Sequence, residues 1–286
     1  MTFMDLTGEI EKNTSQALAE DIGSGDLTAS LIPAEESATA SVISREKAVL
    51  CGKEWFDACF RQLSSDIDVR WFTKDGEIIH NGQTLCVISG NARALLTGER
   101  TALNFLQLLS GVATQTRRYV DAVAGTSATI VDTRKTLPGL RLAQKYAVKC
   151  GGGTNHRMGL YDGILIKENH LLATGGIEAA LRAVKRIVLP EIFVQIEVET
   201  LNDLRTALNA GAQLILLDNF NLDDLAEAVV LNVRLTNRAA VLEASGGITL
   251  ENVRAVAKTG VDRISIGGLT KDVKAIDLSM RFSSDA

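Results

Sequence analysis

One feature of the second half of the chain restricts its fold: from about residue 128 onward, short apolar runs alternate with longer amphipathic stretches. The runs are apolar at successive positions, which is typical of parallel strands covered on both faces. The stretches between them have the apolar spacing of helices. The runs are ATIVDT, GILIK, IFVQIEV, QLILLD, AAVLEA and RISIG. The pattern predicts repeated strand–helix units that build a parallel sheet.

A complete β/α barrel has eight strands, so these six runs predict an open or incomplete α/β barrel of parallel strands. A polar or glycine residue closes each run, at intervals of about 21 to 33 residues. The carboxyl ends of barrel strands form the rim where chemistry takes place. We therefore expect cations and carboxylates to meet at one rim. The closing residues are Asp132 with Arg134, Lys167, Glu197, Asp218, Glu243 with Ser245, and Gly267.

The first 110 residues have a different pattern, in which strands alternate apolar and polar residues as in an antiparallel sheet. A helix is predicted near Lys53 to Leu63, and a long helical pattern from about Ala92 to Val123 leads to the barrel. The segment VKAIDLSMRF is predicted to be a strand that returns to the first domain. The predicted domains are an N-terminal α+β sandwich over residues 1–110, joined by residues 272–286, and the open barrel over residues 111–271.

Composition argues against several classes of protein. No apolar run approaches the roughly 18 residues that a membrane helix needs. The net charge of -5 gives no long-range attraction for nucleic acid. The chain starts without a basic and apolar leader. Its cysteines form no CxxC pattern, so we expect buried, reduced thiols and a cytoplasmic protein. The cysteines are Cys51, Cys59, Cys86 and Cys150.

The stretch from Arg134 to Lys167 is strongly basic, with seven Lys or Arg residues and one acid. Two like charges about 8 Å apart cost roughly 2 kcal/mol at an effective dielectric constant of about 20. An anion would relieve this repulsion, and the glycines at 151–153 supply backbone that can approach a ligand closely. We therefore predict a site for a small, highly charged anion.

Several side chains at the rim have more than one possible role. Arg134 suits a carboxylate or phosphate, or is a solvated surface residue. Lys167 ends a barrel strand, where a Schiff-base aldolase would also carry its lysine. Glu197 and Asp218 are oxygen ligands suited to Mg²⁺ or sugar hydroxyls, or form salt bridges to the rim cations. On the helix after the first strand, Lys149 is expected on a solvated face, whereas the preceding Arg141 and Lys145 could border a phosphate.

Four segments closely resemble quinolinate phosphoribosyltransferases, the carboxylating nicotinate-nucleotide pyrophosphorylases. They are EDIGSGDLT (20–28), DTRKTLPGLR (132–141), KYAVKCGGGTNHRMGLYDGILIKENH (145–170) and LLDNF (216–220). The resemblance implies an N-terminal α/β sandwich joined to an open α/β barrel of about six or seven parallel strands. It also implies a homodimer whose active sites are shared between subunits. It implies a reaction of quinolinate with 5-phosphoribosyl 1-pyrophosphate that gives nicotinate mononucleotide, pyrophosphate and CO2, with Mg²⁺, in de novo NAD synthesis.

The resemblance also implies roles for individual residues. The quinolinate carboxylates would be held by Arg134, His156, Arg157 and Lys167, with Arg100 of the partner subunit. Thr133 and Lys135 would contact quinolinate and the pyrophosphate region. Glu197 and Asp218 would bind Mg²⁺, directly or indirectly, or the ribose hydroxyls. The 5′-phosphate would lie on Ser245, Gly246, Gly247, Ile266, Gly267 and Gly268. The implied catalytic residues are Lys135, Lys167, Glu197 and Asp218.

Two positions depart from the family pattern, since Lys271 stands where many members have histidine and Gln144 where many have glutamate. Both lie outside the core motifs and concern details near the phosphates. Three other functions stay open from the sequence. They are transfer to a different pyridine carboxylate, a Schiff-base aldolase that uses Lys167, and a phosphate-binding module without catalysis.

Overall fold

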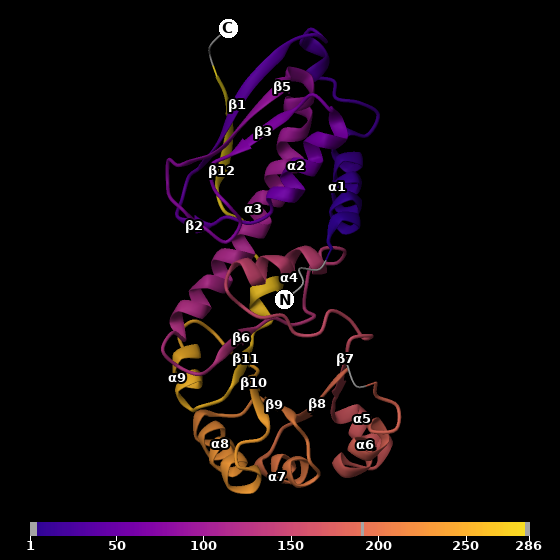
Figure 1. Cartoon of the computed structure of the whole chain (residues 1–286), viewed down its shortest axis with the longest axis vertical. Helices are drawn as coiled ribbons and strands as arrows, with labels where there is room; N and C mark the ends of the chain where they lie inside the picture. The colour runs from indigo at the N-terminus through magenta and orange to yellow at the C-terminus, as the bar shows by residue number, and fades with distance from the viewer. Residues whose placement is uncertain (1–4, 190–191, 284–286) are drawn as a thin grey trace. The chain divides into compact units, whose positions relative to one another are not determined.

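The computed structural model describes residues 5–189 and 192–283 and contains two compact units. The first unit comprises residues 1–117, 136–152 and 269–286, and the second comprises residues 118–135 and 153–268. Residues 136–152, which the sequence assigns to the barrel domain, cluster with the first unit. Figure 1 shows the helices and strands of both units.

The first unit is built on a four-stranded antiparallel sheet with the order β12-β1-β5-β3. β12 pairs with β1 from Ala40 opposite Phe282 to Ser44 opposite Leu278. The predicted return of the C-terminal segment to the first domain is therefore confirmed. The strands are β1 (Ser37–Ser44), β3 (Asp68–Trp71), β5 (Thr84–Asn91) and β12 (Leu278–Phe282), and a small second sheet pairs β2 (Ala48–Val49) with β4 (Ile78–Ile79).

Close helix packing forms the core of the first unit. Helix α2 (Lys53–Leu63) buries Trp55, Phe56 and Phe60 on one face. A Cβ atom on Gly98 would lie 2.8 Å from Phe60, so this glycine allows helix α3 to approach α2. The helices of this unit are α1 (Thr7–Ile22), η1 (Ala29–Leu31), α2, α3 (Ala92–Ala122), whose last residues belong to the second unit, and α4 (Arg141–Cys150).

The second unit contains a six-stranded parallel sheet with the order β6-β11-β10-β9-β8-β7. In this order β6 and β7 are the edges, so the predicted open sheet of six strands is confirmed. The strands are β6 (Thr129–Val131), β7 (Gly163–Ile166), β8 (Phe193–Val198), β9 (Leu214–Asp218), β10 (Val241–Ser245) and β11 (Arg263–Ser265).

Helices follow the strands of the parallel sheet, as strand–helix units require (Figure 1). Two of these helices begin at capping side chains: Thr200 accepts the Asp203 N–H, and Asn221 accepts the Asp224 N–H. The helices are α5 (Glu168–Thr174), α6 (Ile177–Val184), α7 (Leu201–Asn209), α8 (Leu222–Thr236), α9 (Val253–Lys258) and α10 (Gly268–Lys271).

Among residues 5–189 and 192–283, no helix has the length and apolar character that a membrane crossing requires. The four cysteines are free thiols, and Cys51, Cys59 and Cys86 are buried as expected. Cys150 differs, because it is only half-buried. Lys149 is exposed as predicted, whereas Lys145, one helical turn earlier, is fully buried.

Candidate functional site

The carboxyl ends of the parallel strands surround one pocket of about 360 Å³ within the second unit. Every strand of the sheet supplies a residue to it, either at its end or in the loop that follows. The convergence expected from the strand-closing residues is therefore present in the fold. The lining residues are Thr133, Arg134, Lys135, His156, Arg157, Leu165, Lys167, Glu197, Leu216, Asp218, Glu243, Ser245 and Ser265.

The remaining predicted site residues do not line this pocket. Gly246 and Gly247 follow Ser245, and the segment 266–268 follows Ser265, so they continue from lining residues. A Cβ atom on Gly267 would lie 2.9 Å from the Lys135 side chain, which places this loop against a pocket residue. Arg100 is exposed on helix α3 in the other unit.

A short loop brings His156 and Arg157 to the end of β6. Asp132 is fully buried and accepts hydrogen bonds from the Asn155 side chain at 2.6 Å and the His156 backbone N–H at 2.8 Å. Thr154 forms an isolated parallel bridge with Val131. Asp132 therefore acts as the anchor that fixes this loop, because its carboxylate satisfies donors that the loop would otherwise bury without partners.

Two arginines give the pocket its cationic side. Arg157 is buried and donates to the Gly163 carbonyl oxygen at 2.9 Å. Burial lowers the pKa of the Arg157 guanidinium, and the nearby charge of Arg134 lowers it further. The Nε atom of Arg134 is buried and has no hydrogen-bond partner among the described residues. Two mutually repelling guanidinium groups are thus held beside one cavity, an arrangement that an anion would relieve.

Lys167 lies at the mouth of the pocket and forms a salt bridge with Glu197. Its Nζ lies 2.9 Å from the Glu197 carboxylate, and the two side chains are 48% and 10% exposed. The Lys167 backbone N–H donates to Nδ1 of His170 at 3.0 Å, which orients the turn into α5. This salt bridge holds the Lys167 amine against a carboxylate, whereas a Schiff-base aldolase needs that amine free to attack a carbonyl carbon.

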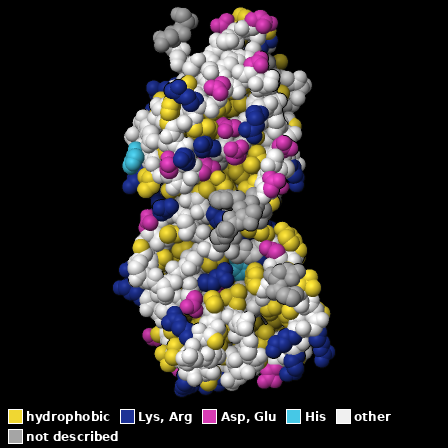
Figure 2. All heavy atoms as spheres, viewed as in Figure 1, with side chains coloured by type: hydrophobic (Ala, Val, Ile, Leu, Met, Phe, Trp, Pro, Cys, Tyr) yellow, Lys and Arg dark blue, Asp and Glu magenta, His cyan; other side chains and the backbone are white. Residues whose placement is uncertain are grey.

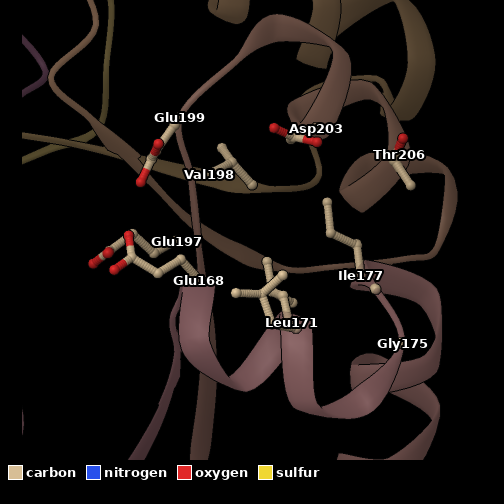
Figure 3. Close-up of a pocket in the computed structure, with 11 residues that line it drawn as sticks. Glu168, Leu171, Gly175, Ile177, Glu197, Val198, Glu199, Asp203 and Thr206 are labelled. Atoms are coloured by element: carbon tan, nitrogen blue, oxygen red, sulfur yellow. The ribbon is translucent and has the colours of Figure 1, made fainter.

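Carboxylates are the other charged groups at this pocket. Asp218 and Glu197 line it, and Glu168 and Glu199 lie close to Glu197 (Figure 3). A hydrogen bond and the negative charge of Glu168 raise the pKa of Glu199, with smaller contributions from the charges of Asp218 and Glu197. Carboxylate oxygens are of the kind that Mg²⁺ prefers as ligands.

A second pocket of about 570 Å³ adjoins this carboxylate group (Figure 3). Glu168, Glu197 and Glu199 lie at one end of it, and apolar side chains such as Leu171 and Ile177 line the rest together with Asp203. It shares Glu197 with the first pocket but contains no Lys or Arg. The first pocket, which combines both charges, is therefore the better candidate for an anion site. Figure 2 shows Lys and Arg side chains beside a histidine on the unit that carries the parallel sheet.

The loop after β10 has a conformation that requires glycine. Gly246 has φ of +96°, and a Cβ atom there would overlap the side-chain oxygen of Asn219, which itself has φ of 58°. The backbone of two strand ends thus approaches closely at this point. Such glycine-rich turns expose N–H groups that can hold a phosphate.

Four lining residues lie outside the set predicted for the site. Glu243 is one of the strand-closing residues, so the periodic pattern marked its position but not its role. Ser265 ends β11 two residues before Gly267, so the predicted end of that strand was late by two residues. Leu165 and Leu216 are apolar strand residues, and no sequence signal separates such residues from the core.

Gln144, one of the two departures from the family pattern, has a structural role in the first unit. It is fully buried, its side-chain oxygen accepts the Leu137 N–H at 2.8 Å, and its nitrogen donates to the Thr270 carbonyl at 2.8 Å. A glutamate could accept the first bond but, when ionised, could not donate the second. Lys271 forms a salt bridge with Asp272 at 3.5 Å.

Comparison with known proteins gives two family matches. The family model described as quinolinate phosphoribosyl transferase, N-terminal domain, matches residues 26–110, and the model for the C-terminal domain matches residues 112–281. A probable nicotinate-nucleotide pyrophosphorylase [carboxylating] of Bacillus subtilis is 41% identical over 272 residues, which cover 95% of this chain and 93% of that protein.

Two further relatives have similar names. The nicotinate-nucleotide pyrophosphorylase [carboxylating] of Mycobacterium leprae is 43% identical and covers 93% of this chain and 94% of its own length. The solved structure of the nicotinate-nucleotide pyrophosphorylase from Francisella tularensis is similar with a TM-score of 0.92, at 42% identity and 96% coverage of both chains.

Proposed function

This chain belongs to the quinolinate phosphoribosyltransferase family, and on that premise we propose that it makes nicotinate mononucleotide for NAD synthesis. The substrates are quinolinate and 5-phosphoribosyl 1-pyrophosphate, and the other products are pyrophosphate and CO2. The observation that carries this proposal is the pocket of the second unit, in which four cations and three carboxylates meet at the ends of parallel strands.

Quinolinate is a pyridine with two adjacent carboxylates, which matches the cationic side of the pocket. Arg134 and Arg157 repel each other when no anion is present, so binding of a dicarboxylate removes an unfavourable interaction as well as adding charge-assisted hydrogen bonds. Thr133, Lys135 and Lys167 lie in the same pocket and complete this side. We assign these residues to quinolinate and to the pyrophosphate group beside it.

The carboxylate side suits the second substrate. Glu197 and Asp218 would hold Mg²⁺ or the ribose hydroxyls, because both line the pocket and carboxylate oxygens are ligands that Mg²⁺ prefers. When bound, Mg²⁺ supplies positive charge that neutralises pyrophosphate as it leaves. The loops that carry Ser245 to Gly247 and Ile266 to Gly268 are assigned to the 5′-phosphate.

The proposed reaction has two stages. The pyridine nitrogen attacks C1 of the sugar while the bond from C1 to the pyrophosphate oxygen breaks. The ring then carries a positive charge, so the bond to the 2-carboxylate breaks, CO2 leaves, and the electron pair left on C2 takes up a proton. The protein contributes by orienting the reactants and by stabilising charge, because no covalent intermediate is needed.

The proposal includes a homodimer in which Arg100 of the partner subunit completes the site. Arg100 is exposed on α3 and is thus free to meet a second subunit. A heterodimer of Arg100→Ala and Lys135→Ala chains should regain activity, since one of its two sites would be intact. If exchanged heterodimers stay as inactive as the parents, the shared site is wrong.

The test of the function is release of labelled CO2 from quinolinate, measured together with pyrophosphate. We expect both products in equal amounts, dependent on 5-phosphoribosyl 1-pyrophosphate. A turnover of nicotinate without CO2 would identify a different pyridine substrate. Borohydride trapping of a carbonyl compound on Lys167 without pyrophosphate release would identify an aldolase.

A pair of arginine variants ties this activity to the pocket. Arg157→Ala should lower kcat/KM, with a loss of transition-state stabilisation on the order of 2 to 5 kcal/mol, because the substrate carboxylate loses its buried partner. Arg182→Ala is the matched control, since Arg182 is 66% exposed on α6 and pairs with Glu178 at 3.6 Å. Equal activity of the two variants would contradict the assignment.

A further inference from the structure

A chain of buried polar side chains borders the pocket and includes His156. His156 Nε2 lies 2.6 Å from Oε1 of Gln195 and 3.8 Å from Oε1 of Glu243. The second oxygen of Glu243 lies 3.3 Å from Nε of Arg263. The side chains of His156 and Glu243 are 8% and 0% exposed, and Gln195 is also fully buried. The chain joins strands β8, β10 and β11 to the loop that carries Arg157.

The hydrogen bonds of this chain determine where His156 carries its proton. The backbone N–H of Arg157 donates to Nδ1 of His156 at 2.7 Å. A backbone N–H can only donate, so Nδ1 acts as the acceptor and has no proton. The proton is therefore on Nε2, which donates it to the oxygen of Gln195. This arrangement corresponds to a neutral imidazole, because an imidazolium would place a second N–H against that of Arg157.

The charge near the ring favours the same tautomer. Glu243 lies on the Nε2 side, and neither of its buried oxygens has a hydrogen-bond partner among the described residues. Its negative charge favours a proton on Nε2 over one on Nδ1, while Arg263 offsets that charge. A T-shaped contact with Phe193, at 5.5 Å between ring centres, further limits rotation of the imidazole.

We propose that Gln195, with Glu243 and Arg263 behind it, is a positioning residue that fixes His156 as the neutral Nε2–H tautomer. His156 in turn holds the backbone of Arg157 and thereby the guanidinium that faces the pocket. This differs from the role that the family resemblance implies, in which His156 would hold a substrate carboxylate directly. The structural part of the inference is independent of the proposed function, and its kinetic part rests on that function.

The direct test is nitrogen NMR of the histidine rings in the full chain at pH 7.5. The chain has three histidines, and loss of one signal set in His156→Asn assigns its ring. We expect the pattern of a neutral ring protonated on Nε2. A proton on Nδ1, or a cationic ring, would overturn the proposal whether or not the protein has activity.

Variants then test the positioning role. Gln195→Met keeps the side-chain length but lacks the acceptor, so the imidazole is no longer held at Nε2 and can turn away from the Arg157 N–H. His156 should then become a mixture of tautomers. Glu243→Gln should cause a smaller shift in the same direction, because its oxygen is 3.8 Å rather than 2.6 Å from Nε2. Ser265→Ala is the control within the same pocket and should leave the His156 signals unchanged. An unchanged tautomer in Gln195→Met would refute the role of Gln195.

The kinetic test separates a neutral positioning ring from a charged ligand. In His156→Asn the new side-chain oxygen can still accept the Arg157 N–H, so kcat/KM for quinolinate should stay within about tenfold of wild type. In His156→Leu no acceptor remains, and we expect a loss of about a hundredfold. Equal losses in both variants, with the wild-type tautomer as expected, would show that His156 acts on the substrate itself. Absence of quinolinate turnover in the wild type would instead refute the proposed function and leave the NMR result standing.

Discussion

Asp57 in the first unit offers a test of how burial and charge set the stability of this fold. It lies on α2, and its carboxylate accepts the indole N–H of Trp71 at 2.9 Å. Burial raises the pKa of Asp57 from its ordinary 3.8 to about 6, although the bond from Trp71 partly opposes this shift. The ionised carboxylate is thus less stable in the folded protein than in the unfolded chain.

The direction of the pH effect follows from this difference. Between about pH 4 and pH 6 the folded state holds more protons than the unfolded state, so stability falls as the pH rises through this window. The full difference between 3.8 and about 6 corresponds to about 3 kcal/mol. Since Asp57 is partly open to solvent, we reduce the expected cost to about 1 to 2 kcal/mol.

The perturbation is Asp57→Asn, which keeps an oxygen that can accept the Trp71 N–H but cannot ionise. Urea unfolding should show the variant to be more stable than wild type by about 1 to 2 kcal/mol at pH 7.5, with most of this gain absent at pH 4. Both tryptophans, Trp55 and Trp71, lie in the first unit, so their fluorescence reports its unfolding. Asp68→Asn, at an exposed position on β3, is the control and should show the same difference at both pH values. A variant less stable than wild type by an equal amount at both pH values would refute the reasoning.

Three further predictions follow from particular contacts. Gly246→Ala should raise KM for 5-phosphoribosyl 1-pyrophosphate more than Gly247→Ala does, because only a Cβ atom at residue 246 would overlap Asn219. Equal KM values in the two variants would contradict this steric argument. The pKa of Cys59 and of Cys86 is raised to about 12 by burial, so an aromatic disulfide reagent at pH 8 should leave both unmodified until urea unfolds the protein. Asn232→Ala should lower the free energy of unfolding in urea by about 1 to 3 kcal/mol, because the buried side chain of Asn232 donates to the Ala240 carbonyl at 2.7 Å. A decrease below about 0.5 kcal/mol would contradict this.

The parallel sheet was predictable because its signal is local. Each strand has a run of successive apolar residues, and a polar or glycine residue closes each run. Examples are Lys167 after β7 and Asp218 at the end of β9. Strand ends of a parallel sheet share one edge, so spacing alone predicts that these side chains meet. The helix over 53–63 also has a local periodic signal. The return of β12 to the first domain is a contact between distant segments, which a local pattern does not determine.

Contacts between distant segments could not be predicted in the same way. Cys51, Asp75 and Cys150 place their ligand atoms within 4.8 Å of one another, although no spacing in the sequence relates them. Lys145 shares an i, i+4 pattern with the exposed Lys149 but is fully buried. The network behind His156 likewise depends on Gln195, a polar residue inside an apolar run whose partner lies 39 residues away. Burial of polar groups is set by tertiary packing, so local patterns do not encode it.

The balance of charge in the pocket leads to a last prediction, which concerns Mg²⁺. Four cationic side chains and three carboxylates line the pocket, so its side chains carry a small net positive charge. A doubly charged quinolinate is attracted by this net charge, whereas 5-phosphoribosyl 1-pyrophosphate carries more negative charge than it can offset. Removal of Mg²⁺ by a chelator should therefore leave quinolinate binding nearly unchanged in calorimetry and weaken binding of the sugar pyrophosphate at least about tenfold. The double variant Glu197→Gln, Asp218→Asn should bind the sugar pyrophosphate with less dependence on Mg²⁺. Removing the two negative charges lowers the affinity for the ion and also the repulsion between the pocket and the substrate that the ion relieves. Equal effects of Mg²⁺ on both ligands would mean that the carboxylates of this pocket do not serve the sugar pyrophosphate, and the division of the site into a cationic and an acidic side would be wrong.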